Sequence, residues 1–342
     1  MKRALVTGAG GFIGGGVVRR FLAEGWFVHA MVRRNVPPAL KELQAQGRLE
    51  LLPLDMTDFP RLRESMEQLP RLDAVVHCAA RASDVGRDSA FRLNNLEAVK
   101  ELAVNALRLE AGIFVFVSTT DVYGLRDFSG ETEDELDYDR KTANPYPRYK
   151  ILAEEWLKTN LPPERYSIVR PAAVWGKDDP TLTRRIRNFL AVSPWIIHFG
   201  PWKGANRWPL AHVERVGWAC FMAATHPDAR GLAFHVLDPE RASMEEVYRR
   251  VAREYFPEKR FLSIFLPLWC GLIPGALSTF AARVLNLEHP PWDPSLYALH
   301  SVSRNLDFSP ARFEKLLASF EKPFPLAEGE RPDIGGTYTK PL

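Results

Sequence analysis

Six glycines lie between Gly8 and Gly16, in the stretch ALVTGAGGFIGGG near the start of the chain. An apolar, strand-like run precedes them, and an apolar, helix-like run follows. Gly8, Gly11 and Gly14 have the spacing of a strand-to-helix turn. Gly8 allows the tight turn, Gly11 lets backbone amides approach a pyrophosphate, and Gly14 lets the helix pack on the strand. The amino terminus of the helix then faces the phosphates, so the turn predicts dinucleotide binding.

Strands and helices alternate over the first 120 residues. Apolar runs predict strands at 3–8, 26–33, 49–55, 73–80 and 113–119, with long helices at 11–25 and 94–112. Continuous apolar strands separated by helices indicate a parallel sheet covered on both faces, which right-handed crossovers make a doubly wound α/β (Rossmann) fold. Because 342 residues exceed one such unit, we expect a cofactor domain at 1–170 and a smaller, partly interleaved carboxy-terminal substrate domain at 171–342.

Charge and cysteine content narrow the class of protein. The formal net charge of +3 is too small to suggest a nucleic-acid binder. Cys78, Cys220 and Cys270 are odd in number and far apart, so they predict neither a disulfide framework nor a metal site. No signal peptide precedes the first strand. We therefore expect a cytoplasmic protein that binds a small molecule and no metal.

Tyr146 and Lys150 lie four residues apart in YPRYK, so one helix would present both on the same side. A free tyrosine has a pKa of about 10 and is a poor base at neutral pH. A neighbouring ammonium and a positively charged nicotinamide would favour the phenolate, giving an apparent pKa below that of free tyrosine. The pair is therefore a candidate for proton transfer to or from a substrate hydroxyl.

Several motifs in one order give a family resemblance. These are TGAGGFIG, LDMTD, HCAA, NNLEAV, STTDVYG, YPRYK, RPAAVWG and WPLAHVERV. The sequence resembles the extended short-chain dehydrogenase/reductase family, of the NAD-dependent epimerase/dehydratase type, from Lys2 to Val216 and more loosely to Phe320. It departs from the family pattern at Ala98, where glycine is preferred.

The resemblance implies roles for particular residues. Thr119 would bind the substrate oxygen, Tyr146 would transfer the proton, and Lys150 would hold the nicotinamide ribose. Asn95 would either hold a relay water or cap the local backbone. Tyr123 and Tyr149 would be structural. The implied cofactor contacts are Gly8, Gly11, Phe12, Ile13, Gly14, Arg33, Arg34, Asp55, Met56, Ala79, Ala80, Tyr146, Lys150 and Pro171.

The end of the second strand bears on the choice between NAD and NADP. An acidic residue there would bind the ribose 2′-hydroxyl, but the sequence AMVRRN has Val32 near that position, followed by Arg33 and Arg34. Arginines suit a 2′-phosphate, which favours NADP. The alternative is that both arginines lie on a solvated loop and the enzyme takes NAD.

Residues 261–282 carry no charge, and together with SRNLDFSP they loosely resemble the 3β-hydroxysteroid dehydrogenase-like branch. Pro267, Pro274, Gly271 and Gly275 would break the segment into two short helical pieces. A buried lid over the substrate is favoured over a hairpin docked peripherally on a membrane, and a spanning helix is disfavoured.

Three functions fit these observations. The first is an NAD(P)-dependent oxidoreductase that interconverts a secondary alcohol and a ketone on an apolar, steroid-like or lipid-like substrate. The second is a nucleotide-sugar epimerase, in which Arg184, Arg185 and Arg187 would contact a diphosphate unless they form a solvated basic face. A dehydratase would need an acidic pair where Thr120 and Asp121 stand. The third is a non-catalytic dinucleotide-binding protein, which would have no need of Tyr146 and Lys150.

Apolar residues on two helices predict a homodimer. They exceed what one sheet face needs, and family members pair these helices into a four-helix bundle. The residues are Leu102, Leu107, Leu109, Ile151, Trp156 and Leu157.

Overall fold

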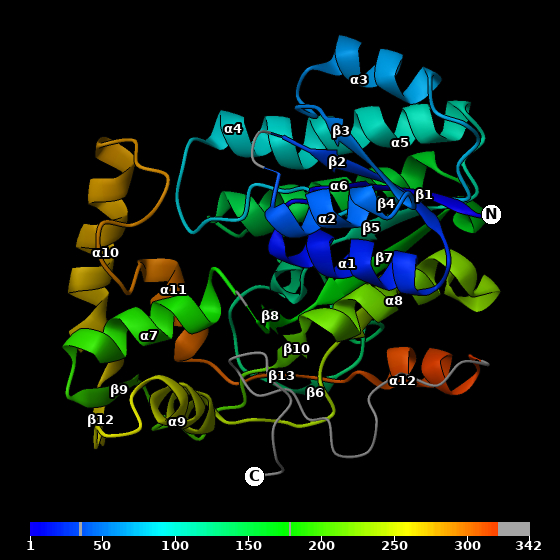
Figure 1. Cartoon of the computed structure of the whole chain (residues 1–342). Coiled ribbons are helices and arrows are strands. Elements are labelled where there is room, and N and C mark those ends of the chain that lie inside the picture. Colours follow the sequence, from blue (N-terminus) through cyan, green and yellow to red (C-terminus); the bar gives the residue numbers. More distant parts are fainter. Residues whose placement is uncertain (34–35, 178, 321–342) are drawn as a thin grey trace.

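The computed structural model describes residues 1–33, 36–177 and 179–320. Its main sheet has seven parallel strands in the order β11-β7-β5-β4-β1-β2-β3 (Figure 1). The strands are β1 (Arg3–Thr7), β2 (Phe27–Val32), β3 (Leu49–Pro53), β4 (Ala74–His77), β5 (Phe114–Val117), β7 (Tyr166–Pro171) and β11 (Ala233–Val236). The predicted doubly wound α/β fold is confirmed.

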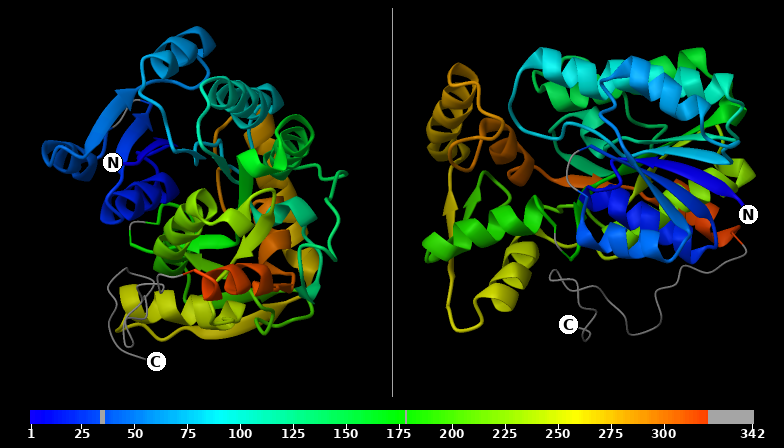
Figure 2. Two further views of the ribbon diagram at one scale, coloured as in Figure 1. Left: turned by 90° about the vertical axis from the view of Figure 1, so that its right-hand side faces the viewer. Right: turned by 45° about the horizontal axis from the view of Figure 1, so that its top comes forward.

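Helices cover both faces of this sheet, and each face has its own apolar core (Figure 2). On one face lie α1 (Phe12–Ala23), α2 (Pro38–Ala45), α8 (Val213–Thr225) and α12 (Ala311–Ala318). On the other lie α3 (Phe59–Glu67), α5 (Ala98–Arg108) and α6 (Pro145–Asn160). The short α4 (Asp88–Arg92) and a π-helical turn at Leu93–Glu97 lead into α5. The strands are therefore buried on both faces, which explains their uninterrupted apolar sequences.

Parts of the second half of the chain return to this sheet. Strand β11 pairs with β7 at the sheet edge, and α8 packs along α1. That packing is close: a Cβ added to Gly16 would lie 2.8 Å from Cγ2 of Val213, and one on Gly217 would lie 3.0 Å from the Gly16 carbonyl oxygen. The sequence therefore interleaves the two halves through α1 and α8.

Three small parallel ribbons extend the molecule beyond the main sheet. Strand β8 (Ala173–Trp175) pairs with β10 (Leu210–His212), and β6 (Phe128–Glu131) pairs with β13 (Leu306–Phe308). The third ribbon joins β9 (Trp195–Phe199) to β12 (Leu262–Leu266). Helices α7 (Leu182–Val192) and α9 (Met244–Tyr255) share a separate apolar core with β8, β9 and β10, whereas β6 and β13 belong to another.

The uncharged segment 261–282 is not divided into the two short helical pieces that were expected. It forms strand β12 and then one continuous helix, α10 (Leu268–Val284), which passes through Pro274 instead of stopping there. Gly271 and Gly275 lie on the inner side of α10, where a Cβ on Gly271 would come within 2.7 Å of the Leu299 side chain in α11 (Leu296–Val302). This close packing holds the helix together across the proline.

Nor is α10 a buried lid, because Trp269 on its outer side is 65% exposed. Within the described residues, no helix combines the length and apolar character needed to cross a membrane. Helices α10 and α11 lie at the end of the molecule opposite the amino terminus (Figures 1 and 2).

Half of the residues from which the homodimer was predicted are core. Leu102 and Leu157 are buried against the sheet, and Ile151 is buried in a separate apolar cluster with Tyr123 and Phe128. Leu107 is exposed as expected, together with Val104 and Leu152. The expectation of surplus apolar surface was therefore wrong in three of its residues.

Candidate active site

The glycine turn joins β1 to α1 with little space to spare. Gly8 has a φ of +65°, a left-handed conformation that favours glycine. A Cβ on Gly14 would lie 2.1 Å from the Gly8 carbonyl oxygen, so only glycine allows α1 to begin so close to the strand. By contrast, a Cβ on Gly15 would find no atom nearer than 3.6 Å, so this position has room for a methyl group.

Helix α1 opens directly from this turn. Its capping residue, Gly11, provides no side-chain acceptor for the first amides of the helix. Phe12 and Ile13 form the first turn of α1. Amides at a helix amino terminus that no side chain caps can bind a phosphate, so the geometry fits a dinucleotide pyrophosphate.

The other predicted cofactor residues lie around the carboxyl edge of the sheet. Ala79 follows β4 and abuts the turn: a Cβ on Gly8 would lie 2.8 Å from its Cα atom. The next residue, Ala80, is exposed. Pro171 is the last residue of β7. Strand order therefore brings residues from β1, β4 and β7 to one edge, where open α/β sheets bind ligands.

The residues that follow β2 and β3 lie along the same edge, where the adenosine of the cofactor is expected. Arg33 follows β2 and is exposed, while Arg34 falls outside the described residues. After β3, Asp55 accepts hydrogen bonds from the backbone amide and hydroxyl of Thr57, at 3.0 and 2.7 Å. Met56 is buried among core side chains. These contacts fix the turn that carries Asp55.

Thr119 and Tyr146 meet just beyond the end of β5. Asn144 caps α6 by accepting a 2.8 Å hydrogen bond from the Tyr146 amide, and Pro145 occupies the first position of the helix. Thr119 begins the short helical turn after β5, where its hydroxyl accepts from the Asp121 amide at 3.1 Å. The hydroxyls of Thr119 and Tyr146 share a hydrogen bond. The local sequence thus positions both predicted catalytic hydroxyls.

Lys150 lies one turn further along α6 and is fully buried. Its ammonium donates a 2.7 Å hydrogen bond to the Val117 carbonyl and lies 4.6 Å from the centre of the Phe116 ring. Burial lowers the pKa of Lys150 to about 8. The lysine is therefore held at the end of β5, beside the site.

Tyr146 differs from the expectation of a lowered pKa. Burial raises its pKa above the ordinary value, and the nearby Asp121 carboxyl raises it further. Only the hydrogen bond with Thr119 acts in the opposite direction. In the protein alone, desolvation outweighs any help from Lys150, so Tyr146 is a protonated phenol at neutral pH.

Two groups beside Tyr146 were not identified as site residues from the sequence. Asp121 interacts with both Thr119 and Tyr297, and burial raises the pKa of its carboxyl. Tyr297, on α11, also interacts electrostatically with Tyr146, and burial raises the pKa of its phenol well above the ordinary value. Asp121 is visible in the STTDVYG motif, whereas no local pattern marks Tyr297.

A charged cluster holds α11 in this position. Ser295 caps α11 and donates a 2.5 Å hydrogen bond to Asp84. Arg185, on α7, donates to Asp84 at 2.8 Å and also pairs with Asp293. Arg185 is therefore an internal bridge between α7, the loop after β4 and the start of α11, and not part of a solvated basic face.

Asn95 uses both ends of its amide on the protein backbone. Its Oδ1 accepts from the Arg81 amide at 2.7 Å, and its Nδ2 donates to the Arg81 carbonyl at 2.9 Å. The side chain is buried within the π-helical turn. These bonds correspond to the expected alternative in which Asn95 caps local backbone, and they fix the segment that follows β4.

The tyrosines expected to be structural are bound within the protein. Tyr149 donates to Asp88 at 2.6 Å, and the Tyr123 hydroxyl lies 2.9 Å from Nε2 of His235. Trp175 is buried and donates to Asp238 at 2.6 Å, so it packs in the core of the second half. His212 caps α8.

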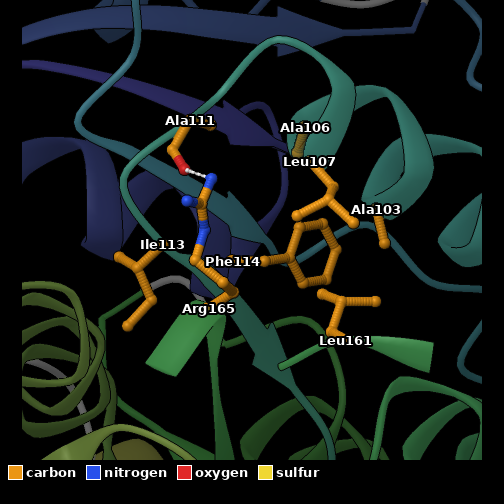
Figure 3. A pocket seen from close by; sticks show the side chains of 8 residues that line it. All are labelled: Ala103, Ala106, Leu107, Ala111, Ile113, Phe114, Leu161 and Arg165. Carbon is orange, nitrogen blue, oxygen red and sulfur yellow. Dashed lines mark hydrogen bonds between the residues drawn. The ribbon is translucent and has the colours of Figure 1, made fainter. Parts of the chain in front are cut away.

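A separate hollow lies at the other end of the strands, where β5 begins. Its wall includes Arg165, which donates a 2.7 Å hydrogen bond to the Ala111 carbonyl (Figure 3). The lining residues are Ala103, Ala106, Leu107, Ala111, Ile113, Phe114, Leu161 and Arg165. Since it adjoins the start of β5 and Thr119 follows the end, this hollow is not part of the candidate site.

Comparison with known proteins agrees with this geometry. The model of the NAD-dependent epimerase/dehydratase family matches residues 4–236. The chain belongs to this family. Its members are extended short-chain dehydrogenases/reductases, so the protein is an NAD(P)-dependent enzyme that acts on a small molecule.

Individual relatives are distant. A 2-alkyl-3-oxoalkanoate reductase of Shewanella oneidensis is 24% identical over 313 residues, covering 85% of this chain and 75% of that protein. A 3 beta-hydroxysteroid dehydrogenase/Delta 5→4-isomerase of Mycobacterium tuberculosis is 27% identical over 266 residues, covering 73% and 69%.

Among solved structures, that of gox2253 matches with a TM-score of 0.70 and 20% identity, covering 95% of this chain and 94% of that one. This similarity shows the shared fold over nearly the full length of this epimerase/dehydratase family member.

Proposed function

We propose that this protein interconverts a secondary alcohol and a ketone on an apolar, steroid-like or lipid-like substrate, with Tyr146 as the general acid/base. The observation that supports this most is the hydrogen-bonded pair of Thr119 and Tyr146 beside buried Lys150, at the sheet edge that carries the glycine turn. Residues 1–170 would bind the cofactor, and 171–342 would bind the substrate.

The cofactor would lie across the carboxyl edge of the sheet. The glycine turn and the start of α1 would hold the pyrophosphate, Asp55 and Met56 would contact the adenine, and Ala79, Ala80 and Pro171 would line the nicotinamide side. Lys150 would hold the nicotinamide ribose. When bound, the nicotinamide supplies the donor or acceptor of the hydride.

The chain's own residues would manage the substrate oxygen and its proton. Thr119 would hold the oxygen of the ketone or alcohol. Tyr146 would give its phenolic proton to that oxygen during reduction and take it back during oxidation. Burial, which raises the pKa of Tyr146, favours the protonated phenol that donates to a ketone oxygen. Asn95 would act as a positioning residue through Arg81.

The nucleotide-sugar epimerase alternative uses the same Thr119, Tyr146 and Lys150. It also needs cations for a diphosphate, and Arg185 is already bound by Asp84 and Asp293. That engagement favours the apolar substrate. A purely non-catalytic role would leave the Thr119–Tyr146 pair unexplained.

A substrate panel followed by nicotinamide absorbance would test the proposal. Sterols, alkyl ketones, aryl ketones and UDP-sugars would be compared with both cofactors. We expect turnover of at least one sterol or ketone and none of the UDP-sugars. Conversion of UDP-sugars alone, detected by chromatography, would contradict the proposal and support the epimerase.

The residues at the end of β2 bear on the preference between NADP and NAD. With buried Val32 in place of an acid and Arg33 exposed beside it, NADP is favoured over NAD. The ratio of kcat/KM for NADPH and NADH measures this preference. A higher value with NADH would contradict it.

Assembly and location are further parts of the proposal. We infer a homodimer through α5 and α6, where Val104, Leu107 and Leu152 are exposed. Light scattering at micromolar concentration would test it, and a monomer mass would contradict it. A cytoplasmic protein with peripheral membrane contact through residues 261–282 fits the exposure of α10.

A further inference from the structure

Helix α10 presents one continuous apolar side to solvent. Its outward residues recur at intervals of three or four, so they form a single stripe along the helix. The α10 stripe consists of Trp269, Ile273, Leu277, Phe280 and Val284, each between 56% and 66% exposed. Large apolar side chains gathered in one exposed row mark an interaction surface.

The opposite side of α10 is already occupied. Gly271, Gly275, Ser278 and Ala282 are buried there. Ser278 donates a 2.6 Å hydrogen bond to the Trp292 carbonyl, and the Thr279 hydroxyl accepts from the Leu296 amide at 2.9 Å. The protein thus fixes the orientation of α10 and leaves the stripe facing outward.

The charge within the segment that carries the stripe is positive. Between residues 261 and 287 the only charged side chain is Arg283, which is exposed near the end of α10. Both signs occur outside this segment: Glu258, Lys259 and Arg260, all exposed, precede β12, and Glu288, 76% exposed, follows the segment and pairs with Arg81. A second copy of the chain would offer Arg283 no carboxylate from the segment that carries its own stripe, whereas an anionic surface complements this charge.

We propose that the α10 stripe docks this protein on an anionic lipid surface. A helix with Trp, Phe and aliphatic residues on one side and a cation near one end can lie in the interfacial plane of a bilayer. At 17 residues, α10 is about 26 Å long and is bonded to the protein along its inner side, so it lies on the bilayer instead of spanning it.

The position of α11 links this surface to the site. It packs between α10 and the catalytic residues, and it carries Tyr297 to Asp121. The lipid-facing helix is therefore one helix layer from Tyr146. This link rests on the proposed function, because an apolar ketone or alcohol would be dissolved in the lipid that the α10 stripe contacts.

Vesicle flotation tests the docking without substrate or cofactor. The full chain would be mixed with phosphatidylcholine vesicles or with vesicles of phosphatidylcholine and phosphatidylglycerol at about 7:3. We expect binding to the anionic vesicles, weakened by 0.5 M NaCl. Ile273→Glu should lower the bound fraction about tenfold, whereas Ala45→Glu, at an exposed position on α2 outside the inferred dimer interface, should leave it within about twofold.

Arg283→Gln sharpens the test of charge, since it should weaken binding to anionic vesicles about threefold and leave binding to neutral ones unchanged. Retained NADPH binding would show that each variant is folded. Absence of vesicle binding, or equal losses for Ile273→Glu and Ala45→Glu, would overturn the proposal. Loss of a dimer in Ile273→Glu, with no vesicle binding by the wild type, would identify the stripe as a contact between copies. None of these results depends on the substrate panel, so failure of either proposal can be recognised separately.

Discussion

Helices α8 and α10 are both apolar, yet the fold uses them in opposite ways. Trp218 of α8 is 1% exposed, because α8 packs on both α1 and the main sheet. Trp269 of α10 is 65% exposed, because α10 packs on its inner side alone, against α11 and β9. The comparison shows that hydropathy sets how much apolar surface a helix has, while topology decides whether that surface is buried or available to a partner.

The same contrast holds between the regions that these helices represent. In the half of the molecule that contains the main sheet, α1 and α8, the glycines and charged side chains are held in place by close packing. The α10–α11 pair is attached to that half through a small cluster of polar groups at its inner end. Each of the following variants or conditions disrupts one of these regions or the polar contacts that join them.

The largest expected effect is in the sheet half. Gly14→Ala places a Cβ where the Gly8 carbonyl oxygen lies 2.1 Å away, so the turn must shift. Affinity for NADPH, measured by fluorescence titration, should fall about 100-fold or more, as misplacement of a binding turn by about 1 Å can cause. Gly15→Ala is the matched control and should retain affinity, because its Cβ has room. Equal losses in the two variants would contradict this account of the turn.

The next effect concerns the connection between the regions. Arg185→Leu leaves Asp84 and Asp293 without their shared guanidinium, while Arg184→Leu alters an exposed neighbour on the same helix. Because Arg185 is about a third exposed, we expect a loss of about 1–3 kcal/mol in the free energy of unfolding, and under 0.5 kcal/mol for Arg184→Leu. Denaturant unfolding measures both. Turnover should also fall for Arg185→Leu, since α11 carries Tyr297; unchanged stability and turnover would show that the bridge is dispensable.

The effect that is smallest over any one pH unit is on acid sensitivity, which we expect to arise in the buried sheet. Burial lowers the pKa of His77 to about 3, so the folded protein resists a proton that the unfolded chain accepts near pH 6.5. The stability that this neutral histidine supports is present above pH 6.5 and is lost as the pH falls toward 3.

Unfolding free energies measured between pH 8 and 4 check the sign. Below pH 6.5 the wild type should lose up to about 1.4 kcal/mol per pH unit from this group alone, and His77→Phe should show a correspondingly smaller slope. Between pH 8 and 7 the two slopes should agree. An unchanged slope at acid pH in His77→Phe would show that other groups cause the acid loss.

A feature of the fold or of the site could be predicted from the sequence where the residues that determine it lie close together in the chain. The sheet follows from apolar runs punctuated by glycines, and the Gly8 and Gly14 constraints are local. Tyr146 and Lys150 are one helical turn apart. Tyr297 could not be assigned to the site from the sequence, because its approach to Asp121 depends on how α10 and α11 pack on the rest of the chain. No local sequence pattern encodes that packing.

The errors have similar physical causes. Pro274 was expected to divide the apolar segment, but packing of Gly271 on Leu299 keeps α10 continuous. The expected fall in the Tyr146 pKa includes the charge of a bound nicotinamide, whereas in the protein alone desolvation raises this pKa. Arg185 looked like part of a basic face because its acidic partners, Asp84 and Asp293, are remote in the sequence.

The measurement that tests the central claim most directly is turnover of Tyr146→Phe on a substrate found in the panel. The substitution keeps the ring and removes the phenolic oxygen that shares a hydrogen bond with Thr119. We predict that NADPH affinity stays within about twofold while turnover falls by roughly 10²–10⁴-fold, the usual contribution of general acid/base catalysis. Thr119→Ser, which keeps its hydroxyl, should retain most activity. Wild-type turnover in Tyr146→Phe would contradict the assignment, because the proton would then come from another group.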